Sequence, residues 1–172
     1  MPVLSDRVGT FTDSVIRRMT RINNQYDSIN LSQGFPDFDP PQQLLDALAK
    51  TAYNGPHQYA VTFGAQNFRE ALAKKTSPAL HHEVDPNTEV CVTCGGTEAM
   101  MAAMMTICNP GDKVMIFSPF YENYGADAIL SGAEPIYIPL VPPTYEFDIS
   151  LIEKGFAEGA KALILCNPSN PC

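Results

Sequence analysis

Three short stretches of this sequence carry residue types that could bind a small ligand. The first is Gly95-Gly96-Thr97, where two glycines precede a hydroxyl side chain. Glycines let the backbone approach a ligand closely, and the first amides of a helix lie at the positive end of its dipole without an acceptor inside the helix. With Thr97 near a helix N-cap, this stretch predicts a cradle for a phosphate. The carboxylate of Glu98 is compatible with the cradle if it points away from the ligand.

The other two stretches add an aromatic ring and an amide. They are Ser118-Pro119-Phe120-Tyr121 and Asn167-Pro168-Ser169-Asn170-Pro171. An anion cradle, an aromatic plate and an amide that both donates and accepts hydrogen bonds together suit a flat, phosphorylated heteroaromatic ligand. The dinucleotide pattern G-x-G-x-x-G and the P-loop pattern G-x-x-x-x-G-K-[ST] are both absent from the sequence, which argues against those two nucleotide-binding classes.

Each of these stretches follows a short apolar run that is typical of a buried strand. Strands are predicted over 90–93, 113–117, 134–139 and 160–166, and helices over 97–107, 121–131 and 149–157. This alternation predicts an α/β fold of three layers, with a mainly parallel sheet and helices on both faces. Ligands bind outside the carboxyl ends of such strands, so we expect the three stretches to converge on one site.

The segments that precede this alternation are less regular. We predict an amphipathic helix over 12–24, a short strand over 29–32, and helices over 41–53 and 65–77. Proline and glycine punctuate residues 34–41, which therefore form neither a helix nor a paired strand. The segment 99–107 is apolar almost all round, which predicts a helix buried on every side.

Composition limits the classes of partner. The chain of 172 residues has a formal net charge of −8, which argues against nucleic acids and anionic membranes as partners. The start of the chain lacks the apolar core of a secretion signal, and its longest nearly apolar run, 99–108, is about half the roughly 20 residues that cross a bilayer. We therefore expect a cytoplasmic protein.

The cysteines and histidines do not form a recognisable metal site. Five cysteines are an odd number, and Cys91 and Cys94 would project to opposite faces of a strand, which disfavours a shared metal ion. The adjacent His81 and His82 are expected in an exposed polar loop. We expect buried, reduced cysteines and no metal ligands.

Several motifs together resemble one enzyme family. They are SVIRRMT at 14–20, NLSQGFPDF at 30–38, QY at 58–59, VTCGGTEA at 92–99, NPGD at 109–112, SPFYENY at 118–124 and NPSNP at 167–171. In this order they resemble the class I/II, fold-type I aminotransferases that use pyridoxal phosphate, and most closely the branch with kynurenine, methionine and aspartate aminotransferases. The resemblance implies that 1–40 form an N-terminal arm and the start of a small domain with a substrate loop. It implies that 41–172 form the N-terminal part of the large cofactor-binding domain, which is incomplete at Cys172.

The resemblance also implies roles for single residues. Gly95, Gly96 and Thr97 would hold the cofactor phosphate, Tyr121 would stack on its pyridine ring, and Asn170 would bond its phenolic oxygen. Gly34 would line the substrate carboxylate pocket. Tyr59 would reach the phosphate of a neighbouring subunit, which implies a homodimer. Each role has an alternative. Gly34 could serve only its own turn, and Tyr59 and Tyr121 could serve only packing. Members of the family often have cis bonds at the positions of Ser118-Pro119 and Asn170-Pro171.

The resemblance implies an enzyme that transfers an amino group from an L-amino acid to a 2-oxo acid by a ping-pong mechanism. Transamination requires a lysine that forms a Schiff base, and none of the six lysines here follows the family's Ser-x-x-Lys pattern. We therefore expect an N-terminal fragment, inactive alone, whose catalytic lysine lies beyond Cys172. A β-lyase of the same fold and a short non-catalytic binding or dimerisation module stay open as alternatives.

Overall fold

The computed structural model describes residues 3–10 and 13–172, which form two compact units. One unit contains Cys94–Cys172 together with the N-terminal segment up to Ser14, and the other contains Val15–Thr93. Within the described residues, no helix combines the length and the apolar character that crossing a membrane requires.

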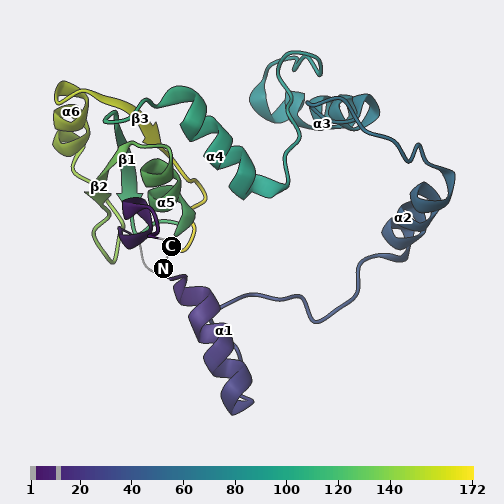
Figure 1. Cartoon of the computed structure of the whole chain (residues 1–172), viewed down its shortest axis with the longest axis horizontal. Coiled ribbons are helices and arrows are strands. Elements are labelled where there is room, and N and C mark those ends of the chain that lie inside the picture. Colours follow the sequence, from purple (N-terminus) through teal and green to yellow (C-terminus); the bar gives the residue numbers. More distant parts are fainter. Residues whose placement is uncertain (1–2, 11–12) are drawn as a thin grey trace. The chain divides into compact units, whose positions relative to one another are not determined.

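A parallel sheet of three strands is the centre of the first unit. Strand β1 (Lys113–Ser118) lies between β2 (Glu134–Pro139) and β3 (Ala160–Ile164), so the order is β2-β1-β3 (Figure 1). Both pairings of β1 are parallel. The sequence predicted all three strands and their direction, because near-continuous apolar runs separated by helices favour parallel pairing.

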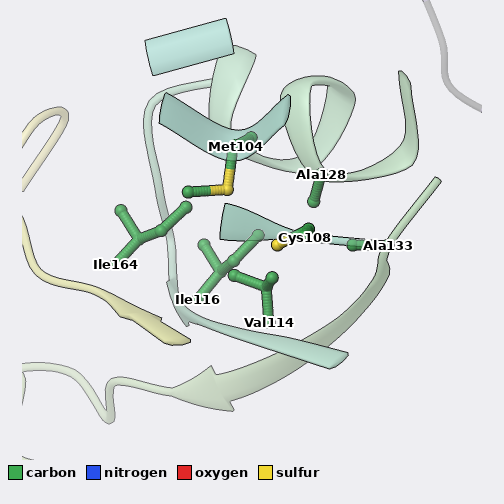
Figure 2. Close-up of a cluster of buried hydrophobic side chains, with 7 residues drawn as sticks. All are labelled: Met104, Cys108, Val114, Ile116, Ala128, Ala133 and Ile164. Carbon is green, nitrogen blue, oxygen red and sulfur yellow. The ribbon is translucent and has the colours of Figure 1, made fainter. Parts of the chain in front are cut away.

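Helices cover both faces of this sheet, as predicted. They are α4 (Gly95–Ile107), α5 (Asn123–Leu130) and α6 (Ile149–Ala157). Side chains alternate along β1, so Val114 and Ile116 pack with Met104 of α4 and Ala128 of α5 (Figure 2). Met115 points to the other face.

The second core layer lies between the sheet and α6. Met115 and Ile138 pack there with Leu151 and Ile152 of α6. Val114, Met115 and Ile116 have no exposed surface. Burying a side chain of this size contributes about 1.5–3 kcal/mol to the free energy of unfolding, so β1 is the best-anchored strand of the unit.

The prediction that the helix after Gly96 is buried on every side was wrong. In α4 only Met104 is buried, whereas Met105 is 64% exposed and Ile107 is 39% exposed. The helix packs on α5 and the sheet along one stripe, and among the described residues of its own unit no other helix or strand covers its remaining sides. Apolar composition therefore overstated the burial of this helix.

Two predicted strands, 29–32 and 90–93, were also wrong. Neither segment joins a sheet in the described residues. The N–H of Val92 donates to the carbonyl oxygen of Phe63 at 3.0 Å, a single backbone bond to a loop. A strand requires a neighbouring strand to satisfy its backbone groups, and no strand of the described chain pairs with these segments.

The second unit contains three helices joined by segments without regular structure (Figure 1). They are α1 (Val15–Tyr26), α2 (Gln42–Asn54) and α3 (Gln66–Leu80). The predicted start of the first helix at Thr12 lies outside the described residues. Helix α3 continues three residues past its predicted end and contains Pro78.

The N-terminal segment belongs to the first unit and lies against α5. A 3-10 helix, η1, spans Asp6–Gly9. The guanidinium of Arg7 donates to the carbonyl oxygen of Leu130 at 3.2 Å, and the hydroxyl of Ser14 donates to the carboxylate of Glu122 at 2.5 Å. The two contacts attach this segment near the two ends of α5.

Candidate functional site

The predicted phosphate cradle forms the first turn of α4. Gly95 has φ +85, a left-handed backbone conformation that favours glycine, and Cys94 before it is the N-cap. A Cβ atom added at Gly95 or at Gly96 would meet no atom of the described residues within 4 Å. The glycines therefore leave open space above the start of the helix.

Glu98 is directed back to the start of its own helix. Its carboxylate accepts a hydrogen bond from the backbone N–H of Cys94. This contact satisfies the N-cap amide and places a negative charge where it complements the helix dipole.

A cavity of about 560 Å³ lies beside α4, from Gly96 and Thr97 of the cradle to Ala103. Its polar and aromatic groups are Gly96 and Thr97 from α4 and Tyr121, Asn123 and Tyr124 from the loop and first turn of α5, and the apolar residues Ala99, Met100 and Ala103 of α4 complete its wall. The side-chain nitrogen of Asn123 donates to the hydroxyl oxygen of Thr97 at 2.8 Å. Sequence reasoning missed Asn123, although it stands two positions after Tyr121 in the same motif.

Tyr121 and Tyr124 meet edge to face beside this cavity. Their ring centroids are 5.8 Å apart and the rings are inclined by 75°, an arrangement that aromatic rings favour. A hydrogen bond with the thiol of Cys166, together with desolvation, raises the pKa of the Tyr124 hydroxyl. Sequence reasoning gave no role to Tyr124 or Cys166.

Tyr124 also lines a second cavity of about 560 Å³, at the carboxyl ends of β1 and β3. Asn167, Ser169 and Asn170 contribute the polar groups of its wall, and most of the remaining wall is apolar. Thr97 and Tyr121 thus line one cavity and Asn170 lines the next, with Tyr124 between them. The predicted cis bonds at Ser118-Pro119 and Asn170-Pro171 are present, and Asn167-Pro168 is cis as well.

The remaining two predicted site residues, Gly34 and Tyr59, belong to the other unit. A Cβ atom on Gly34 would meet no atom of the described residues within 4 Å, and the side chain of Tyr59 is fully exposed. The first unit therefore carries the cradle, Tyr121 and Asn170, while Gly34 and Tyr59 occupy open positions in the second.

Of the five cysteines only Cys108 is buried, so the expectation of buried cysteines was wrong for Cys91, Cys94 and Cys172, which are exposed. All five cysteines are unpaired thiols, and no three His, Cys, Asp or Glu side chains of the described chain gather as metal ligands do. The imidazole Nε2 of His82 lies 2.9 Å from the carboxylate of Glu89. Hydrogen bonds from the backbone N–H of Asp85 and from His82 lower the pKa of Glu89.

The groups around the cradle fit a phosphate ester joined to an aromatic ring. Their donors are neutral, namely the backbone amides of the first helical turn and the hydroxyl of Thr97, and among the described residues no carboxylate lines the cavity. A dianion is stabilised at such a helix start by the amides and the dipole together. The ring of Tyr121 on the cavity wall suits a flat heterocycle. The residues therefore fit pyridoxal phosphate.

Comparisons with known proteins agree with this fit. Residues 26–172 match the family described as Aminotransferase class I and II. The methionine aminotransferase of Escherichia coli is 37% identical over 158 residues, which cover 92% of this chain and 41% of that enzyme. Its name falls within the branch that the sequence motifs indicated.

Solved structures give the same result. The Escherichia coli protein YbdL, which has a methionine aminotransferase function, superposes with a TM-score of 0.90 at 34% identity, over 99% of this chain and 45% of that one. The N-succinyldiaminopimelate aminotransferase of Mycobacterium tuberculosis superposes with a TM-score of 0.89 at 32% identity, over 98% of this chain and 44% of that one. The chain spans less than half the length of these relatives. It belongs to the class I and II aminotransferases, a family of enzymes that depend on pyridoxal phosphate.

Proposed function

We propose that this chain is the N-terminal part of an amino-acid aminotransferase, which moves an amino group from an L-amino acid to a 2-oxo acid in a ping-pong cycle. The observation that carries the proposal is the cavity beside α4, where Thr97 and Tyr121 lie together beside open glycine backbone. The family match over residues 26–172 supports it.

The chain's own residues bind and orient the cofactor in this proposal. The amides at Gly95 to Thr97 and the hydroxyl of Thr97 hold the phosphate, and Tyr121 stacks on the pyridine ring. Asn170 donates to the phenolic oxygen from the neighbouring cavity. Bound pyridoxal phosphate supplies an electron sink that lets an amino group pass between carbon skeletons.

The substrate side of the proposal concerns the N-terminal part of the chain. Gly34 lines the pocket for the substrate carboxylate through its backbone, and residues up to 40 form the arm and substrate loop of a small domain. The large cofactor-binding domain begins at 41. The open space around Gly34 supports this assignment, because a ligand could approach its backbone closely.

We also propose a cytoplasmic homodimer in which Tyr59 reaches the phosphate in the partner subunit. The side chain of Tyr59 is fully exposed, so its ring does not pack within this chain and is accessible to a partner subunit. This exposure supports the assignment. The five unpaired thiols support a reducing compartment.

The polypeptide of 172 residues is expected not to transaminate by itself. None of its six lysines follows the Ser-x-x-Lys pattern of the covalent lysine, and that lysine is also the base for proton transfer in the family. Purified chain, incubated with an L-amino acid, a 2-oxo acid and pyridoxal phosphate, should form no new amino acid. Turnover together with borohydride trapping of the cofactor on one lysine would contradict this.

Binding of a cofactor form that needs no lysine tests the site directly. Titration calorimetry should show that the chain binds pyridoxamine 5′-phosphate more tightly than pyridoxamine, because only the former carries the phosphate. Equal affinity for the two would rule out a phosphate cradle at Gly95 to Thr97. An amino-donor screen on the complete protein would then define the substrate.

A further inference from the structure

We propose that Asn123 is a positioning residue for the phosphate cradle, which orients the hydroxyl proton of Thr97 toward the ligand. The inference rests on the proposed function, since the ligand in question is the phosphate of the cofactor. It adds to that function a residue outside the glycine turn, on a different helix.

The evidence begins with the direction of one hydrogen bond. The side-chain nitrogen of Asn123 lies 2.8 Å from the hydroxyl oxygen of Thr97, and an amide nitrogen donates only. The Thr97 oxygen therefore accepts from Asn123 through one of its lone pairs. Its single proton stays available for another acceptor, and the hydroxyl can rotate only within the limits that this bond sets.

The positions of Asn123 and Thr97 determine where the remaining hydroxyl proton of Thr97 lies. Asn123 is the first residue of α5 and Thr97 lies in the first turn of α4, and both residues line the same cavity. The backbone N–H of Tyr124 donates to the carbonyl oxygen of Tyr121 at 3.0 Å, so a hydrogen-bonded turn fixes Asn123 between the two tyrosines. The hydroxyl proton that remains is thus held beside the cavity.

The charge of the cavity wall makes this orientation important. Among the described residues that line it, none is Lys or Arg, so neutral dipoles must stabilise the phosphate from this side. A hydrogen bond from a neutral donor to an anion is about twice as strong as one between neutral groups. Fixing the Thr97 donor in advance also avoids the cost of ordering it when the ligand binds.

A double-mutant cycle in the complete protein that contains this chain tests the inference. The readout is the dissociation constant of pyridoxamine 5′-phosphate, with pyridoxamine and inorganic phosphate as comparison ligands. N123A should weaken binding of the phosphorylated ligand by about 3- to 10-fold, the range expected for one modest hydrogen bond. It should leave the affinity for pyridoxamine unchanged.

Threonine variants distinguish positioning from a general structural effect. In a T97A background, N123A should have no further effect, because the hydroxyl that it orients is absent. In a T97S background, which keeps the hydroxyl, the loss caused by N123A should persist. Thermal unfolding midpoints of all variants show whether each one folds.

Several outcomes would overturn the inference alone. If N123A weakens pyridoxamine as much as its phosphate, or has the same effect with T97A as with Thr97, Asn123 serves only the fold. If N123A strengthens binding of the phosphate, the hydrogen bond runs in the opposite direction and withholds the proton from the ligand.

The proposed function fails under a different result. If the wild-type protein does not prefer pyridoxamine 5′-phosphate over pyridoxamine, the proposed function is wrong. The double-mutant cycle is then measured with the dissociation constant of inorganic phosphate. Wild-type protein that also fails to bind inorganic phosphate overturns both the function and the role of Asn123.

Discussion

Gly155 of α6 lies directly against Met115 of β1. A Cβ atom on Gly155 would be only 2.2 Å from the sulfur of Met115, whose side chain is completely buried. The absence of a side chain at Gly155 is therefore what lets α6 pack on this face of the sheet.

The substitution Gly155→Ala should destabilise the chain for this reason. The added methyl group must displace a buried methionine, and such overpacking costs about 1–3 kcal/mol of unfolding free energy. Urea unfolding measures the change. Glu153→Ala, at an exposed position of the same helix, should have little effect.

Combining the change with a smaller partner gives a stricter test. Met115→Ala removes the atom that the new methyl group would meet, so Gly155→Ala should cost less in that background than in the native chain. Additive effects of the two substitutions would contradict the steric explanation.

Asp127 of α5 is buried, and its Oδ2 has no hydrogen-bond partner among the described residues. Burial raises the pKa of this carboxyl above its ordinary value of 3.8. Asp127→Asn should therefore raise the free energy of unfolding at neutral pH by about 1 kcal/mol, because an amide is cheaper to bury than a charge.

The pH dependence of this effect has a definite sign. The favourable contribution of protonated Asp127 is fully present below pH 3.8 and is lost as the pH rises through its higher folded-state pKa. The advantage of Asp127→Asn should thus shrink as the pH falls. An advantage that is constant with pH, or that Glu134→Gln reproduces at an exposed position, would contradict it.

The two glycines of the cradle should respond differently to alanine. Gly95→Ala places a side chain at φ +85, and a non-glycine residue held there costs of the order of 1–3 kcal/mol in stability. Gly96 lacks a positive φ, and its Cβ would point into open space on the cavity wall.

Gly96→Ala should consequently leave the thermal midpoint nearly unchanged and weaken binding of pyridoxamine 5′-phosphate. Calorimetry on this variant, with Gly95→Ala as the comparison, separates the two effects. Unchanged affinity in Gly96→Ala would exclude close approach of a ligand to this turn.

Asp112, which directly precedes β1, connects the turn at Asn109 with strand β3. Its carboxylate accepts from the backbone N–H of Asn109 at 2.7 Å and lies 2.9 Å from the ammonium of Lys161 in β3. The hydrogen bond from Asn109, followed by that from Lys161, lowers the pKa of Asp112 below its ordinary value of 3.8.

The contribution of Asp112 to stability is therefore present above pH 3.8 and is lost as the pH falls through the lowered folded-state pKa. Asp112→Asn should destabilise the chain at neutral pH, and the difference from the native chain should vanish in acid. Unfolding free energies measured across this range would contradict the prediction if the difference stayed constant.

Local sequence patterns predicted the strands and helices whose formation depends mainly on neighbouring residues. The apolar runs at 113–117 and 134–139 identified β1 and β2, because each run is bounded by turn residues. The middle of β1 is buried, whereas in β2 only Ile138 is buried. The segment 90–93 has the same character, yet it forms no strand. Pairing depends on a distant neighbour, which no local pattern encodes.

In the candidate site, too, the features that depend on adjacent residues were predicted and those that depend on distant residues were missed. The glycine turn and Tyr121 are visible as motifs, because their chemistry depends on adjacent residues. Asn123 was missed because its function depends on Thr97, which is 26 positions earlier in the chain. The contact of Tyr124 with Cys166 is likewise a product of folding, and only the three-dimensional structure brings these groups together.

The contact of Arg7 with Leu130 sets an order of events during synthesis. The two residues are 123 positions apart, and ribosomes add roughly 5–20 residues per second. The first turn of the chain, η1, must therefore wait roughly 6 to 25 s after its own translation before its docking surface on α5 exists. The residues of η1 thus leave the ribosome well before the surface that they contact has been made.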